Sequence, residues 1–184
     1  SQYRKVYPEL AEIIATIKEP SMRLYNKEST IGNLLTDITR RAAGSDISFL
    51  NSGAIRADLN AGNVTLEQLL NVYPFPDNLT VIELSGKQIK ELIEYSLTLP
   101  YGIGQISGLK IEYDSNRPNM QKIIKIDING GRLIDKQKYT VSTSGYLAKG
   151  GDGYSVFTRG KLINEDLGYP EALYLGFKSL ENIE

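Results

Sequence analysis

Residues 49–56, with the sequence FLNSGAIR, constrain the fold more than any other segment. Apolar residues lead into a turn of small residues that ends in an arginine, as expected where a buried strand presents a cation at its end. Gly53 and Ala54 let a ligand approach the backbone closely. Asn51 adds an amide and Arg56 adds a planar guanidinium fork. The segment therefore predicts a loop that binds a planar or phosphorylated ligand.

The chain contains no histidine and no cysteine, so it lacks the usual ligands of a catalytic zinc or iron centre. Its carboxylates are scattered, and we expect no catalytic residue, metal site or cofactor within it. Asp58 lies close to Arg56 in the sequence, which leaves a surface salt bridge as the alternative role for this arginine. The net charge of −1 lacks the basic excess that binding to a nucleic-acid polymer requires.

The length of 184 residues is sufficient for one domain with a single core. No apolar run approaches the roughly 18 residues that a membrane span needs, and no segment resembles a secretory signal. The chain starts at Ser1 and not at methionine, which favours a processed or excised part of a longer protein. The absence of cysteine excludes disulfides without deciding the compartment.

Apolar residues recur at helical spacing over residues 7–17, and Pro20 ends the pattern. This predicts a leading helix or the tail of a linker from an upstream domain. A second helix is predicted to begin at Ser29 or Thr30, which are good N-cap residues, and to stop at Gly44.

Capping residues mark two further helices, one from Thr65 and one from Ser85, and residues 170–180 are predicted to form the last helix. Apolar patterns predict strands at residues 46–50, 79–84, 106–113, 122–128 and 138–142. Because helices and strands are mixed and do not strictly alternate, the predicted fold class is α+β (mixed α/β), a single domain with a mixed sheet flanked by helices. We assign residues 1–20 to a leading helix or interdomain linker and residues 21–184 to the domain.

Residues 145–154 (GYLAKGGDGY) place glycines around one carboxylate after a predicted strand. Asp152 in such a loop can accept hydrogen bonds from both hydroxyls of a ribose, although on this segment alone an Asx-turn that satisfies its own backbone is the better interpretation. Tyr146 and Phe75 are both predicted in loops, where an aromatic ring either stacks on a base or covers the core of its own domain. The segment is not a P-loop, because no Gly-Lys-Ser/Thr sequence enters a helix.

Four segments, in this order, resemble the C-terminal domain of the 5′-nucleotidase family: ESTIGNLLTD (28–37), NSGAIR (51–56), VYPF (72–75) and GGDGY (150–154). Each segment alone is a weak signal, but their order and spacing together are specific. Residues 81–97 and 105–109 also look like the family, so the resemblance covers roughly residues 22–160.

The resemblance implies a protein of two domains. In that family an N-terminal metallophosphatase domain holds two divalent metal ions and the catalytic residues, and the C-terminal domain, which this chain resembles, binds the nucleotide. Carried over by motif position, Phe75 and Tyr146 would sandwich the base and Asn51 would hydrogen-bond its edge. Asp152 would hold the ribose hydroxyls and Arg56 would meet the phosphate.

Two positions depart from the family pattern. Family members commonly have a phosphate-binding arginine three residues before the glutamate of the first motif, and three residues before Glu28 this chain has Tyr25. Arg23 is the nearby arginine that could replace it. The ring at Tyr146 is often phenylalanine in the family, and tyrosine keeps the aromatic face while adding a hydroxyl.

The resemblance implies that the chain is the nucleotide-binding domain of an extracytoplasmic (secreted, periplasmic or cell-wall-associated) bacterial 5′-nucleotidase-type phosphohydrolase. Rotation of this domain would carry the substrate to the dimetal centre of an N-terminal metallophosphatase domain in the same polypeptide. We expect the chain alone to be inactive, and its ligand to be a nucleoside monophosphate or a related nucleotide, such as a cyclic nucleotide or a nucleotide sugar. The alternative is a non-catalytic ligand-binding or adhesion module of a cell-surface protein that retains the fold.

Overall fold

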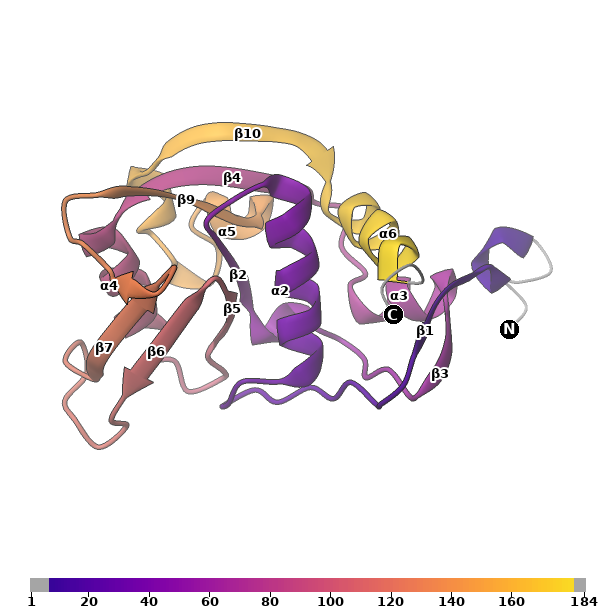
Figure 1. Cartoon of the computed structure of the whole chain (residues 1–184), viewed down its shortest axis with the longest axis horizontal. Helices are drawn as coiled ribbons and strands as arrows, with labels where there is room; N and C mark the ends of the chain where they lie inside the picture. Colours follow the sequence, from indigo (N-terminus) through magenta and orange to yellow (C-terminus); the bar gives the residue numbers. More distant parts are fainter. Residues whose placement is uncertain (1–6, 181–184) are drawn as a thin grey trace.

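A five-stranded mixed sheet forms the centre of the protein, whose computed structural model describes residues 7–180 (Figure 1). Its strand order is β10-β4-β9-β2-β5, with the respective bounds Lys161–Gly168, Asn78–Ser85, Lys138–Ser144, Ile47–Asn51 and Gly104–Ser107. β2 and β9 run parallel, and the other neighbouring pairs of this sheet are antiparallel. Two smaller antiparallel sheets contain β6 (Leu109–Tyr113), β7 (Ile123–Ile128) and β8 (Gly131–Arg132), and β1 (Ile13–Ile17) with β3 (Gly62–Thr65).

The helices begin and end largely where local capping signals predict. In residues 7–180 the α-helices are α2 (Thr30–Ala43), α3 (Leu66–Val72), α4 (Gly86–Ser96), α5 (Gly145–Ala148) and α6 (Tyr169–Leu180). The Ser29 hydroxyl accepts a hydrogen bond from the N–H of Gly32, and left-handed Gly44 ends α2. Thr65 and Ser85 each form a reciprocal capping box with the glutamine three residues later. These predictions of helix starts are confirmed.

The central sheet separates two apolar cores, because alternate residues of its strands face opposite sides. On one side Leu50 of β2 packs with buried residues of α2, α3 and α6. On the other side Ile47 and Phe49 of the same strand pack with α4 and β7. Figure 1 shows α2 crossing one side of the sheet and α4 lying with β6 and β7 at one end of the molecule. The prediction of a single mixed α/β domain is confirmed.

The helix predicted over residues 7–17 is wrong. Pro8–Ala11 form one 3-10 turn, and Ile13–Ile17 form β1, which pairs with β3. The β-branched isoleucines of this segment favour a strand, and Ile14 and Ala15 are buried in the core. β1 therefore packs into the body of the domain, while the assignment of the leading segment to an interdomain linker stays a prediction that extends outside the described residues.

Three other segments differ from the sequence-based prediction. The strand predicted over residues 106–113 is two strands, β5 and β6, which belong to different sheets and meet at Gly108. Residues 145–153, predicted as a loop, begin with α5 and end with a 3-10 turn (η3, Gly151–Gly153). β10 was not predicted because its sequence, KLINEDLG, lacks apolar alternation, and most of the strand is exposed at the edge of the sheet.

The chain passes from one sheet to another at Gly108, and a substitution there tests whether this junction requires glycine. Its φ is +89°, and a Cβ built on it would lie 2.2 Å from the carbonyl oxygen of Asp46. Gly108→Ala adds this clash to the left-handed strain, so we expect it to lower the free energy of unfolding by about 2–3 kcal/mol. Gly130→Ala is the matched control, because φ is +80° there but a Cβ meets nothing within 4 Å. We expect the control to lower the free energy of unfolding by about 1 kcal/mol. Urea denaturation measures both variants, and equal losses would contradict a clash at Gly108.

Candidate functional site

The predicted site residues lie where β2 and β9 end. Because the two strands run parallel, the segments that follow them leave the sheet at the same edge. After β2, Asn51 leads into a 3-10 turn (η2, Ser52–Ala54) and then to Arg56, whose N–H donates to the carbonyl of Val72 at 2.8 Å. After β9 come α5 and η3, which contains Asp152. A hydrogen bond between the side chains of Asn51 and Asp152 joins the two segments.

Asp152 lies at the centre of a hydrogen-bond network. Its Oδ2 accepts from Asn51 Nδ2 at 2.6 Å, and its Oδ1 accepts from the hydroxyl of Tyr146 at 2.8 Å. The backbone N–H of Asp152 donates to the same hydroxyl oxygen at 3.1 Å, and its carbonyl accepts from the hydroxyl of Tyr95 at 2.9 Å. The carboxylate therefore bonds to the side chains of Asn51, from another segment, and of Tyr146, and not to its own turn as the Asx-turn interpretation expects.

Tyr146, on the first turn of α5, belongs to this network although its side chain is 53% exposed. Its backbone N–H donates to Asp77 Oδ2 at 2.8 Å, and Ser144 caps the helix by accepting from the N–H of Leu147. The hydrogen bond from its hydroxyl to Asp152 raises the pKa of Tyr146 above the ordinary value, because it favours the neutral phenol.

Phe75 follows α3 in a loop between two prolines, as predicted. It is partly buried against the core, where it meets the ring of Tyr73 edge-on with centroids 5.4 Å apart. Tyr73 itself stacks on Tyr169, and burial raises the pKa of Tyr73. The Phe75 ring also faces the guanidinium of Arg56, whose Cζ lies 5.4 Å from the ring centroid. Phe75 thus covers part of the core and also presents ring surface to the site.

One cavity of about 620 Å³ brings together all five residues that the sequence predicts for the site. Its lining consists of Asn51, Gly53, Ala54, Arg56, Tyr73, Phe75, Pro76, Asp77, Ser144, Tyr146, Lys149 and Asp152. The volume lies in the range of small-molecule sites. Three further lining residues, Asp77, Lys149 and Tyr73, were not predicted as site residues. No recognised motif contains Asp77, whereas Lys149 lies within residues 145–154 and Tyr73 lies within the VYPF motif.

Arg23 and Asp58 hold the turn that carries Arg56. Asp58 Oδ1 accepts from the backbone N–H of Arg23 at 2.7 Å and from its Nε at 3.3 Å, so Asp58 pairs with Arg23 and not with Arg56. Nη1 of Arg23 donates to the carbonyl of Arg56 at 2.6 Å. Within residues 7–180, Arg56 forms no ion pair. Arg23 therefore supports the position of Arg56, while the exposed Tyr25 occupies the expected arginine position.

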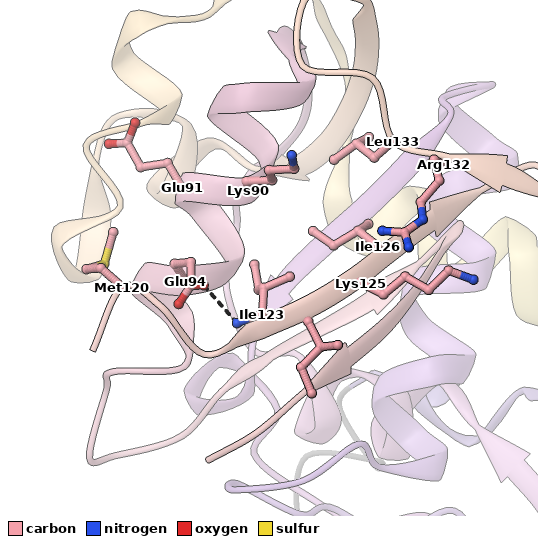
Figure 2. Close-up of a pocket in the computed structure, with 10 residues that line it drawn as sticks. Lys90, Glu91, Glu94, Met120, Ile123, Lys125, Ile126, Arg132 and Leu133 are labelled. Atoms are coloured by element: carbon pink, nitrogen blue, oxygen red, sulfur yellow. Dashed lines mark hydrogen bonds between the residues drawn. The ribbon is translucent and has the colours of Figure 1, made fainter. Parts of the chain in front are cut away.

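A second hollow, of about 390 Å³, lies between α4 and β7 and contains none of the predicted site residues (Figure 2). Figure 2 shows the Glu94 carboxylate directed at the start of β7, where it accepts from the N–H of Ile123 at 2.8 Å. The same carboxylate accepts from the N–H of Lys122 at 3.0 Å, and Lys90 pairs with Asp135 at 2.5 Å. Because these charges have partners in the protein, they favour a structural role for this surface.

Neither a metal centre nor a membrane-spanning helix occurs in residues 7–180. No group of three or more histidine, cysteine, aspartate or glutamate side chains in this range could hold a metal ion. No helix of the same range is long and apolar enough to cross a bilayer. The two metal ions that the family resemblance implies therefore do not fit the described part of this chain.

Comparison with known proteins gives consistent matches. Residues 13–159 match the family model described as 5′-nucleotidase, C-terminal domain. The chain is 37% identical over 156 residues to the trifunctional nucleotide phosphoesterase protein YfkN of Bacillus subtilis, covering 78% of this chain and 11% of that protein. The cell wall protein Lmo0130 of Listeria monocytogenes is 33% identical over 154 residues, 75% of this chain and 20% of that protein. The crystal structure of a 5′-nucleotidase precursor from Thermus thermophilus matches 98% of this chain and 39% of that chain, with a TM-score of 0.89 and 27% identity. The chain spans less than half the length of each of these relatives.

Proposed function

The chain belongs to the 5′-nucleotidase C-terminal domain family, and we propose that its pocket binds a nucleoside monophosphate or a related nucleotide. The observation that carries this proposal is that one cavity contains a guanidinium, an amide, a carboxylate and two aromatic rings from separate segments. These groups suit the parts of a nucleotide, because aromatic rings stack on bases, carboxylates accept from hydroxyls and a guanidinium binds phosphate.

Each of the five side chains has a role in this proposal. Phe75 and Tyr146 stack on the base, and Arg56, which forms no ion pair within residues 7–180, binds the phosphate. Asp152 accepts from the ribose hydroxyls at the acceptor positions that its two protein partners leave open. The side-chain amide of Asn51 donates one N–H to Asp152, and its second N–H donates to the edge of the base.

We place hydrolysis of the ligand outside this chain. The family resemblance implies an N-terminal metallophosphatase domain in the same polypeptide, where two divalent metal ions would supply an activated hydroxide. The residues of this chain bind the substrate and orient it, and we propose no catalytic residue among them. The whole protein would then be a phosphoric ester hydrolase of the 5′-nucleotidase type.

We expect the 184-residue chain to bind adenosine and AMP weakly and to release no phosphate from AMP when Mg²⁺, Mn²⁺ or Zn²⁺ is added. Tyrosine fluorescence can follow binding because Tyr146 and Tyr73 line the pocket. Titration with adenosine, AMP, a 2′,3′-cyclic nucleotide and a nucleotide sugar identifies the ligand class, and a phosphate assay measures hydrolysis. No response to any of these ligands would contradict the binding site. Phosphate release that Arg56→Ala abolishes would contradict the inactivity of the chain.

The second candidate function is a non-catalytic ligand-binding or adhesion module of a cell-surface protein, and the surroundings of Arg56 favour it. Tyr25 stands at the expected arginine position and Arg23 is bonded to protein atoms, so the pocket offers one guanidinium to a phosphate. A relative is named as a cell wall protein, and we propose an extracytoplasmic location for either candidate. Asp-x-His and Gly-Asn-His-Glu motifs upstream of Ser1, in a longer polypeptide that contains this chain, would favour the hydrolase; their absence there would favour the module.

A further inference from the structure

The hydroxyl of Tyr146 forms hydrogen bonds with Asp152 that a phenylalanine ring could not form. It donates to Asp152 Oδ1 at 2.8 Å and accepts from the Asp152 N–H at 3.1 Å, so one phenol forms two hydrogen bonds with one residue. The ring lies directly against Gly151, where a Cβ would be 2.4 Å from Tyr146 Cε1. An exposed side chain ordinarily changes rotamer within nanoseconds, whereas these contacts hold Tyr146 in one orientation.

The Asp152 carboxylate is consequently fixed from two sides. Tyr146 bonds to Oδ1, and Asn51 Nδ2 donates to Oδ2 at 2.6 Å. A carboxylate has about four acceptor positions, so about two stay open after these bonds. Asp152 lines the cavity, and one open acceptor position on each carboxylate oxygen would suit the two hydroxyls of a vicinal diol.

We propose that the Tyr146 hydroxyl is a positioning group that orients the Asp152 carboxylate for the 2′- and 3′-hydroxyls of a ribose, and so makes the pocket selective for ribosides over deoxyribosides. This inference rests on the proposed function, because it assumes that the pocket binds a nucleoside or nucleotide. Phenylalanine at position 146 would keep the aromatic face for the base. It would leave Oδ1 of Asp152 without its protein partner and the carboxylate freer to rotate, so binding the diol would cost more conformational entropy.

A titration without ligand tests the hydrogen bond itself. The bond to Asp152 raises the pKa of Tyr146, and Asp152→Asn removes the charged acceptor. We therefore expect Asp152→Asn to lower the pKa of Tyr146 towards its ordinary value. NMR of the chain with ¹³C-labelled tyrosine measures this pKa, and sequential assignment from the backbone resonances identifies the Tyr146 signal. An unchanged pKa of Tyr146 in Asp152→Asn overturns the inference.

The ratio of affinities for adenosine and 2′,3′-dideoxyadenosine tests the selectivity. By isothermal titration, we expect the wild-type chain to prefer adenosine by about tenfold or more, because hydrogen bonds to a charged group are strong. We expect Tyr146→Phe to reduce this preference to about threefold or less, with less than about a twofold change for the dideoxynucleoside. Tyr113→Phe is the matched control, since Tyr113 is an exposed tyrosine of β6 that does not line this cavity.

The outcomes separate the inference from the function on which it rests. Equal losses for both ligands in Tyr146→Phe, or an unchanged preference, overturn the inference and leave the proposed function intact. A wild-type chain that binds neither ligand overturns both. Because Asp152→Asn retains Tyr146, the NMR titration can overturn the inference even where Tyr146→Phe does not fold.

Discussion

We expect Arg56→Ala to lower the affinity of the chain for AMP about 10- to 100-fold and its affinity for adenosine less than about threefold. A charge-assisted hydrogen bond to a phosphate contributes about 1.5–3 kcal/mol, and adenosine has no phosphate. Adenosine loses only the effect of the cation on the Phe75 ring, whose centroid lies 5.4 Å from the Arg56 Cζ. Isothermal titration of both ligands at one ionic strength measures the two losses.

Two further variants control this experiment. Arg56→Lys keeps the charge without the planar fork, so we expect an intermediate loss for AMP. Arg132→Ala removes an exposed arginine of the hollow between α4 and β7, and we expect both affinities to stay unchanged. Equal losses for AMP and adenosine in Arg56→Ala would mean that this side chain shapes the pocket and does not bind the phosphate.

We expect Gln105→Leu to lower the free energy of unfolding by about 3–4 kcal/mol. Gln105 lies on β5 with 1% of its surface exposed, and its Oε1 accepts from the N–H and the hydroxyl of Ser29 at 2.9 and 3.0 Å. Its Nε2 donates to the carbonyl of Lys27 at 2.9 Å and to the hydroxyl of Ser52 at 3.0 Å. Leucine has a similar volume but cannot hydrogen-bond to Ser29, Lys27 and Ser52. Each buried polar group that loses its hydrogen-bond partner lowers the free energy of unfolding by about 1–3 kcal/mol.

The matched control for this variant is Gln121→Leu, the same change at an exposed glutamine, for which we expect a change within about 0.5 kcal/mol. Urea denaturation with equal m-values measures both. Gln105→Leu should also weaken nucleotide binding, because Ser52 begins the turn between Asn51 and Arg56. A loss of stability below about 1 kcal/mol would contradict the importance of this network.

Helix ends and site motifs could be predicted from the sequence because they depend on residues close together in the chain. Thr65 and Ser85 form capping boxes with residues three positions later, and Gly44 ends α2 through its own backbone conformation. Asn51 ends a strand, and Arg56 follows the short turn after it. Such local patterns predict which side chains the loop presents to a ligand.

Features that depend on distant partners could not be predicted. The isoleucines of β1 fit a helical spacing as well as a strand, and the pairing of this segment with β3 favours the strand. The bond between Asn51 and Asp152 joins residues 101 positions apart, and the bond between Tyr146 and Asp77 joins residues 69 positions apart. From residues 145–154 alone, an Asx-turn was the better interpretation because the true partners of Asp152 include a residue of β2.

We expect the pocket to form late in folding, because it depends on the parallel pairing of β2 with β9. The N–H of Asp46, just before β2, bonds to the hydroxyl of Thr140 in β9, 94 positions away, so a long loop must close before the two strands meet. Hairpins between sequence neighbours, such as β6 with β7, have no such requirement. Nucleotide binding is therefore a property of the completed sheet, and a partly folded chain that lacks the β2–β9 pair has no pocket to offer.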